Sequence, residues 1–184
     1  VLTENLIPAE KCHPVHIWLD DVVPFCEWFV IPYVSWYVLI VGSLIWFLLY
    51  SVDSFRSMQT YIIITQIIAM IVYIVFPNRQ DLRPEVFPRE NFATALLGLI
   101  YSVDTNTGVC PSLHVGYSIA IASTWVREKQ ASRGWKLFVV ALCVTICLSV
   151  AFVKQHSVAD IFAAIPMCLF AEWFVFYRKK ESKL

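Results

Sequence analysis

A histidine and an aspartate four residues apart are the feature of this sequence best suited to chemistry. His156 and Asp160 lie in FVKQHSVAD, at the start of the last apolar run. Four residues make about one helical turn, so both side chains share a face once a helix has begun. The carboxylate can then accept a hydrogen bond from one imidazole nitrogen and leave the other as a nucleophile. The alternative is structural, with Asp160 capping a helix that His156 precedes.

A second histidine follows a helix-start signal in Cys110-Pro111-Ser112-Leu113-His114. Pro111 and Ser112 are typical of a helix N-terminus, where free N–H groups and the Ser112 hydroxyl can hold an anion. His114 falls in the first turn, from which it could donate a proton to a leaving-group oxygen. A helix cap with an interfacial histidine would have the same sequence.

Basic residues near these motifs could hold a phosphoryl group. Arg79 and Arg83 lie in NRQDLRP, after the second apolar run, and Lys154 precedes His156 by two residues. Arginine offers a bidentate fork to phosphoryl oxygens, and lysine offers a point charge. A juxtamembrane patch that contacts lipid headgroups is the alternative.

The composition is that of a membrane protein. The chain has 184 residues, of which 59% are hydrophobic and 15% charged, whereas soluble domains carry about 25% charged residues. The length fits a single membrane-embedded domain over residues 1–184. The net charge of zero provides no field that would attract nucleic acid. No spacing of Cys and His is typical of a metal site, so we expect no metal.

Five apolar runs predict an all-α bundle of transmembrane helices. They extend over residues 29–52, 61–76, 113–126, 137–153 and 161–177. A sixth apolar stretch, residues 91–101, is too short to span and is expected at the membrane surface or between helices. Residues 14–28 mix Trp and Phe with acidic residues, which suits an interfacial amphipathic helix.

Basic residues predict the orientation. They gather in the connection 127–136 and in the tail 178–184, which two spans place on one side, so we expect this side to be cytoplasmic. Residues 1–28 and all three motifs then face the extracytoplasmic side of the plasma membrane. Because five spans with an external start are unusual, a sixth span before Val1 is expected. Convergence of three distant motifs on one membrane face favours a site there.

The motifs together resemble those of a known family. Arg83-Pro84, the PSLH of residues 111–114, and His156 followed by Asp160 are similar to the three signature motifs of the membrane branch of the type 2 phosphatidic acid phosphatase superfamily. PSLH and KQH are most similar to the branch of inositol phosphorylceramide synthases and their bacterial relatives. The resemblance covers about residues 30–177. It implies a polytopic bundle of six spans in the full-length protein.

The resemblance also implies roles. His156 would be the nucleophile on phosphorus, oriented by Asp160; His114 would protonate the leaving group; and Arg83 and Ser112 would bind phosphoryl oxygens. A phosphohistidine would be resolved by water in a phosphatase or by an alcohol in a transferase, with no metal or cofactor. The family's first-motif Lys and third-motif Arg are replaced here by Phe76 and Val150. Arg79 and Lys154 are the candidates to take over their roles.

The expected function is therefore hydrolysis of a membrane lipid phosphate or diphosphate monoester through a phosphohistidine. One alternative is a lipid phosphotransferase that moves a phospho-headgroup between lipids. A second is a non-enzymatic lipid-binding or transport protein, which would have no need of His114, His156 and Asp160 together.

Overall fold

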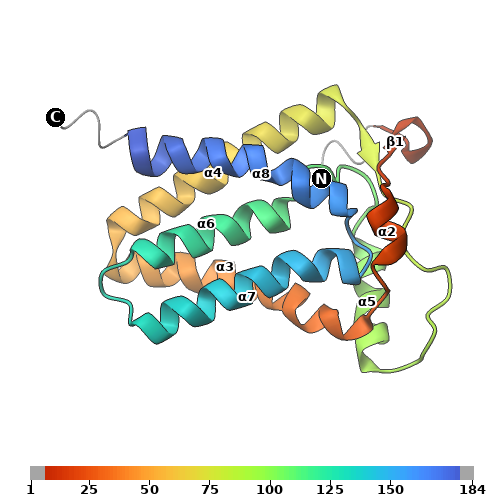
Figure 1. The fold of residues 1–184 in the computed structure, drawn as a ribbon, viewed down its shortest axis with the longest axis horizontal. Coiled ribbons are helices and arrows are strands. Elements are labelled where there is room, and N and C mark those ends of the chain that lie inside the picture. Colours follow the sequence, from red (N-terminus) through yellow and green to blue (C-terminus); the bar gives the residue numbers. More distant parts are fainter. Residues whose placement is uncertain (1–6, 179–184) are drawn as a thin grey trace.

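Five long helices run back and forth along the molecule in this computed structural model, which describes residues 7–178. Successive helices point in opposite directions, so the chain passes from one end of the bundle to the other at each helix (Figure 1). The helices are α3 (Val30–Tyr50), α4 (Val52–Val75), α6 (Leu113–Arg127), α7 (Arg133–Phe152) and α8 (Val158–Glu172), the last continued by a π-helical segment, Trp173–Tyr177.

Four of these helices are long and apolar enough to cross a membrane: Glu27–Tyr50, Val52–Val75, Arg133–Phe152 and Val158–Tyr177. The third expected run forms α6, whose 15 residues extend about 22 Å at 1.5 Å per residue. It packs against α4, α7 and α8. Gly116 permits this close packing, because a Cβ there would lie 3.1 Å from the Met167 Cε of α8. The short helix is thus held inside the bundle by its neighbours.

The outward faces of the long helices are apolar. On α3, Val38, Val41 and Ile45 are more than half exposed, and on α4 Ile67 and Ile71 are too. Each set recurs at three- or four-residue spacing, so it forms one stripe along its helix. Stripes of this kind need an apolar solvent, as a lipid bilayer provides. The four apolar helices and their exposed faces therefore indicate a membrane protein.

Short elements cover one end of the bundle (Figure 1). They are a 3₁₀ turn (Ala9–Lys11), β1 (His13–Pro14), α2 (Trp18–Val22), a second 3₁₀ turn (Glu27–Phe29), β2 (Asn78–Arg79) and α5 (Phe92–Val103). The two strands pair in parallel, with His13 opposite Asn78. The connection from α7 to α8 lies at the same end, and the basic connection after α6 lies at the other, as the alternating spans predict.

Two elements differ from the sequence-based expectation. Helix α4 begins at Val52, nine residues before the predicted start. Its first turns are polar, so they do not belong to the apolar run that predicts the helix. Asp53 lies in the first turn, where a negative charge is favourable. The expected amphipathic helix over residues 14–28 is instead the five-residue α2 and a 3₁₀ turn, separated by Pro24. Its acidic residues Asp20 and Glu27 are buried. Of the predicted basic tail, residues 179–184 lie outside the described part of the chain.

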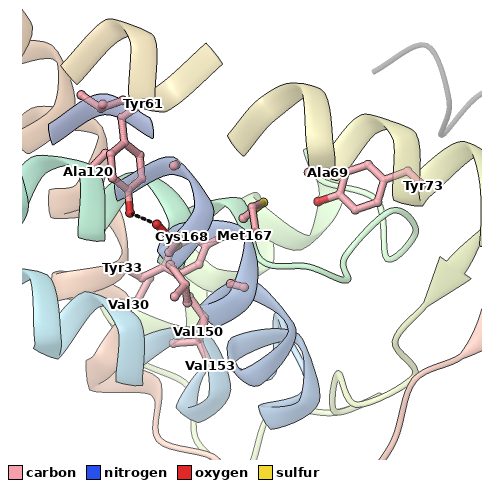
Figure 2. Packing of buried hydrophobic residues seen from close by; sticks show 14 of the residues in the cluster. Val30, Tyr33, Tyr61, Ala69, Tyr73, Ala120, Val150, Val153, Met167 and Cys168 are labelled. Atoms are coloured by element: carbon pink, nitrogen blue, oxygen red, sulfur yellow. Dashed lines mark hydrogen bonds between the residues drawn. The ribbon is translucent and has the colours of Figure 1, made fainter. Parts of the chain in front are cut away.

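The buried core joins α4 to the later helices along the bundle (Figure 2). The Tyr61 hydroxyl donates a hydrogen bond to the Cys168 carbonyl at 2.8 Å, which fastens α4 to α8. The Tyr73 hydroxyl donates to the Pro111 carbonyl at 2.7 Å, just before α6. Both rings are buried, so each hydroxyl satisfies its hydrogen bond within an apolar layer. The segment that carries the second motif is thereby anchored to α4.

Candidate active site

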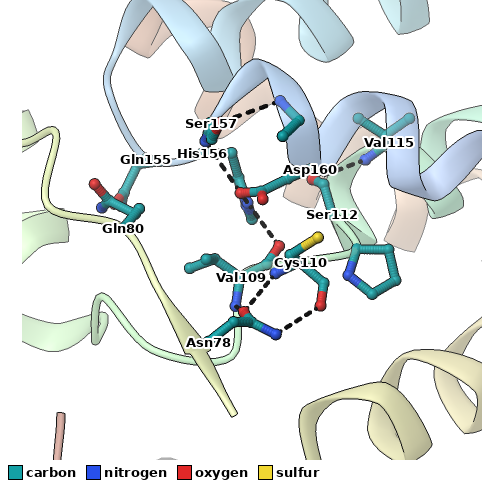
Figure 3. A network of polar contacts seen from close by, with 12 residues as sticks. Asn78, Gln80, Val109, Cys110, Ser112, Val115, Gln155, His156, Ser157 and Asp160 are labelled. Atoms are coloured by element: carbon teal, nitrogen blue, oxygen red, sulfur yellow. Dashed lines mark hydrogen bonds and ion pairs between the residues drawn. The ribbon is translucent and has the colours of Figure 1, made fainter. Parts of the chain in front are cut away.

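The His156 imidazole is held on one nitrogen by two acceptors. Its Nδ1 lies 3.1 Å from Asp160 Oδ2 and 3.0 Å from the Val109 carbonyl oxygen. A carbonyl oxygen can only accept, so Nδ1 carries a proton, and in the neutral ring the lone pair is then on Nε2. The Asp160 side chain is fully buried and His156 is 9% exposed. The predicted contact between the two side chains therefore exists (Figure 3), although His156 lies just before the helix, and the Nε2 of the neutral ring is available for chemistry.

Asp160 is also part of the start of α8. Its Oδ2 accepts from the Ser157 N–H at 3.0 Å, completing a capping box with the Ser157 side chain. The structural and chemical interpretations of this aspartate are therefore compatible. One carboxylate oxygen both fixes the helix start and orients the imidazole.

His114 lies beside His156 within a group of aromatic rings. The centroids of the two imidazoles are 5.7 Å apart. Tyr33 stacks on His114 with centroids 4.6 Å apart, and the Trp36 ring is 4.4 Å away. The His114 Nε2 is buried and makes no hydrogen bond to any described residue. Aromatic packing thus fixes the ring while its nitrogen is left for another partner.

Asn78 holds the segment before α6 in place. Its side-chain oxygen accepts from the Val109 and Cys110 N–H groups at 2.9 and 2.8 Å, and its amide donates to the carbonyls of Phe76 and Cys110, both at 2.9 Å (Figure 3). The Ser112 N–H donates to the Asp160 carbonyl at 3.1 Å. The Val109 carbonyl that contacts His156 is thereby fixed from both sides.

Both histidines line one cavity of about 320 Å³. Residues of α3, α4 and α6 form its apolar and aromatic part, and Asp104, Thr105 and Thr107 form a polar part. Gln155 lines it beside His156. A cavity with an apolar part and a few convergent polar groups is typical of a ligand site. Within residues 7–178, no group of three or more His, Cys, Asp or Glu is placed to hold a metal ion.

Arg83 lies behind the cavity wall. Its guanidinium donates to the Gln155 Oε1 at 2.9 Å, the Asp104 carbonyl at 2.9 Å and the Thr105 carbonyl at 3.0 Å, and it lies 4.8 Å from the Tyr101 ring centroid. Burial lowers the pKa of this guanidinium, although Asp104 opposes the shift. Arg83 therefore braces three lining residues and brings positive charge close to the cavity.

The other three residues predicted to bind phosphate do not line this cavity, and each has a protein partner. Ser112 is buried and its hydroxyl caps α6 by accepting from the Val115 N–H. Lys154 Nζ donates to the carbonyls of Asp20 and Val23 at 2.7 and 2.6 Å. Arg79 pairs with Asp81 at 2.9 Å and donates to a carbonyl of the first 3₁₀ turn. The structure thus brings together His114, His156 and Asp160, with Arg83 one layer behind.

Sequence reasoning missed Asn78, Gln155 and the aromatic rings around His114. Asn78 and Gln155 lie within the two motif segments, in NRQDLRP and KQH, so a buried role for their amides was open to inference. The positions of Tyr33 and Trp36 depend on how α3 packs against α6, for which the sequence carries no local signal. Searches of family models, curated proteins and solved structures find no match to this chain.

Proposed function

We propose that this chain is an integral membrane phosphatase that hydrolyses a lipid phosphate or diphosphate monoester through a phosphohistidine on His156. The observation that carries the proposal is the His156 ring: two acceptors hold its Nδ1–H, its Nε2 keeps a lone pair, and it lines a cavity shared with His114. The motif resemblance points to the same chemistry.

In the first step, the Nε2 lone pair of His156 attacks the terminal phosphorus, and the bond from that phosphorus to the leaving oxygen breaks. That oxygen belongs to the lipid alcohol in a monophosphate and to the remaining phosphate group in a diphosphate. His114 gives the departing oxygen its proton. The imidazole ring carries positive charge as the P–N bond forms, and the Asp160 carboxylate stabilises that charge through Nδ1–H. The substrate's own phosphate charge favours the protonated form of the neighbouring His114.

In the second step, water attacks phosphorus, His114 takes a proton from it, and the P–N bond breaks to release inorganic phosphate. Among the described residues that line the cavity there is no Lys or Arg. Phosphoryl oxygens would therefore meet the Thr105 and Thr107 hydroxyls first, with the Arg83 charge behind them. Direct binding by Arg83 requires it to give up its carbonyl partners.

The test is phosphate release by detergent-purified protein from phosphatidate, phosphatidylglycerol phosphate and polyprenyl diphosphate in excess EDTA. We expect release by the parent and none by His156→Ala or His114→Ala. His16→Ala is the matched control, because this exposed histidine lies in the N-terminal segment and pairs with Asp21. Release that persists in His156→Ala would contradict the proposal. A folded parent that releases no phosphate would favour a phosphotransferase, to be assayed with a second lipid as acceptor.

A further inference from the structure

Asp20, near the start of the chain, contacts the beginning of α8 directly. Its side chain is 3% exposed. Its Oδ2 accepts from the Ser157 hydroxyl at 2.6 Å, and its Oδ1 accepts from the Val158 N–H at 2.7 Å. The same side chain accepts a hydrogen bond from the N–H of Ile17, the N-cap residue of α2, at 2.9 Å, and so helps to fix the start of that short helix. A residue 137 positions away in sequence from Ser157 therefore binds the segment next to His156.

The first N–H groups of α8 show what this contact does. Helices begin with N–H groups that have no partner within the helix. Here the Ser157 N–H donates to Asp160 at 3.0 Å, and the Ala159 N–H donates to the Ser157 hydroxyl oxygen at 3.1 Å. The Val158 N–H donates to Asp20. Asp20 thus supplies a capping acceptor that the helix cannot provide for itself.

Lys154 makes a contact in the opposite direction, from the α7–α8 connection to the N-terminal segment. Its ammonium donates to the carbonyls of Asp20 and Val23, at the end of α2. Lys154 has φ 53°, a left-handed conformation that costs a residue with a Cβ about 1 kcal/mol or more. A backbone hydrogen bond from Cys26 N–H to the Phe152 carbonyl at 3.0 Å joins the same two segments. We call these two sets of contacts the Asp20–Lys154 clasp: the Asp20 carboxylate to the start of α8, and the Lys154 ammonium to the backbone carbonyls of Asp20 and Val23.

The clasp leads to the nucleophile through shared atoms. Asp20 Oδ2 holds the Ser157 hydroxyl, Asp160 Oδ2 accepts from the Ser157 N–H, and the same Asp160 oxygen accepts from His156 Nδ1. If Ser157 shifts, Asp160 Oδ2 loses a donor that holds it in place, and the His156 ring that donates to the same oxygen loses its fixed orientation. Small displacements of a reacting group reduce rates strongly.

We propose that Asp20 is a positioning residue for the His156 nucleophile, acting through Ser157 and Asp160 from a segment outside the three motifs. The inference rests on the proposed phosphohistidine function for its kinetic consequence, though not for its structural one. The N-terminal segment is then part of the catalytic unit, as the support that fixes the α7–α8 connection.

The chain offers a matched control in the adjacent residue. Asp21 carries the same charge, in the same short helix, but its side chain is 70% exposed and pairs with His16 at 2.9 Å. Asp20→Ala and Asp21→Ala remove one carboxylate each, from neighbouring positions. Any effect of net charge or of α2 composition should appear in both variants, and an effect of the clasp in Asp20→Ala alone.

With the best lipid phosphate found for the parent, we expect Asp20→Ala to lower kcat by about 10- to 100-fold while KM changes by less than about twofold, since Asp20 does not line the cavity. Asp21→Ala should match the parent in both constants. A folded Asp20→Ala with parental kcat would overturn the proposal. So would a loss that appears in KM alone, or an equal loss in Asp21→Ala.

Asp20→Asn decides the matter if Asp20→Ala does not fold. It keeps the size of the side chain and one acceptor oxygen for the Val158 N–H, but its NH₂ group cannot accept the Ser157 hydroxyl. We expect a smaller fall in kcat, about 3- to 10-fold, again without a change in KM. A kcat within the error of the parent value would refute the role of Asp20.

An NMR measurement that does not depend on activity separates this inference from the proposed function. In protein labelled with ¹⁵N-histidine, His156 should show the Nδ1–H tautomer, and Asp20→Asn should shift its resonances towards a mixture of tautomers while Asp21→Asn leaves them unchanged. Unchanged His156 resonances in Asp20→Asn would contradict the inference. Failure of the parent to release phosphate, with the tautomer shift present, would contradict the function and leave the positioning role intact.

Discussion

Replacing Asn78 with alanine should destabilise the whole site end of the protein. The Asn78 side chain is fully buried and makes four hydrogen bonds, each 2.8–2.9 Å long, to the backbone of Phe76, Val109 and Cys110. Asn78→Ala removes all four and leaves backbone N–H and C=O groups without these partners. The Val109 carbonyl, which contacts His156, loses its support at the same time.

The magnitude follows from the number of contacts. A buried hydrogen bond contributes about 1 kcal/mol net, and an unsatisfied buried group costs about 1–3 kcal/mol. Allowing for water that reaches some of the freed groups, we expect the free energy of unfolding to fall by about 3–4 kcal/mol. For a chain of this length that corresponds to a Tm lower by roughly 6–16 °C.

Thermal unfolding in detergent, followed by tryptophan fluorescence, measures this effect. Asn106→Ala is the matched control, because Asn106 is half-buried and its amide makes two bonds, of 3.0 and 3.3 Å, at the same end. We expect its Tm to fall by about 2–4 °C, for about 1 kcal/mol. Equal Tm values for the two variants would refute the reasoning that Asn78 anchors the site.

Three further predictions test other parts of the structure. Burial, with the nearby Asp160, raises the pKa of the Cys110 thiol from 9.0 to about 12. Its thiolate fraction at pH 8 should therefore be about a thousandfold lower than that of an unperturbed thiol. We expect iodoacetamide to label Cys110 slowly in the folded protein and fast in SDS, as read by mass spectrometry; fast labelling of the folded protein would contradict this. Gly116→Val should lower the free energy of unfolding by about 1–3 kcal/mol, since α6 is tightly packed there. At Gly42 a side chain meets open space, so Gly42→Val should lower the free energy of unfolding by less than about 1 kcal/mol in the same thermal assay. Equal losses for the two variants would argue against close packing of α6. Asn91→Ala removes the side-chain cap of α5 and should cost about 1 kcal/mol, read as a Tm lower by about 2–4 °C; an unchanged Tm would show that the cap contributes nothing.

The sequence predicted those features of the site that depend on local geometry. His156 and Asp160 are four residues apart around a helix start, and the predicted contact between them exists. Because His156 lies before α8 begins, the capping turn at Ser157 brings the two side chains together rather than helical periodicity. Alternation of apolar runs placed the PSLH segment and the KQH segment at the same end of the bundle. A helix forms over each of the five apolar runs, with errors of up to nine residues where polar turns continue a helix, as in α4. Four of the helices, and not the 15-residue α6, are long and apolar enough to span a membrane.

Contacts between distant segments could not be predicted in this way. Lys154 and Arg79 are predicted to bind phosphate; in the structure Lys154 donates to carbonyl oxygens of the N-terminal segment, and Arg79 donates to one such carbonyl and pairs with Asp81. A basic side chain at a membrane boundary can satisfy either role, and its choice depends on which carbonyls the fold brings within reach. The composition of residues 14–28 predicts an interfacial amphipathic helix, whereas the position of Ser157 next to Asp20 makes this acidic residue a cap of α8.

Trapping the covalent intermediate tests the central proposal most directly. Purified protein is mixed with its lipid phosphate substrate, quenched in alkali within the first turnover, digested and analysed by mass spectrometry for phosphohistidine. We expect the phosphoryl group on His156 in the parent, none in His156→Ala, and an unaltered level in Asp21→Ala. Phosphate release by the parent without any phosphoryl group on His156, or with the group on another residue, would contradict the account.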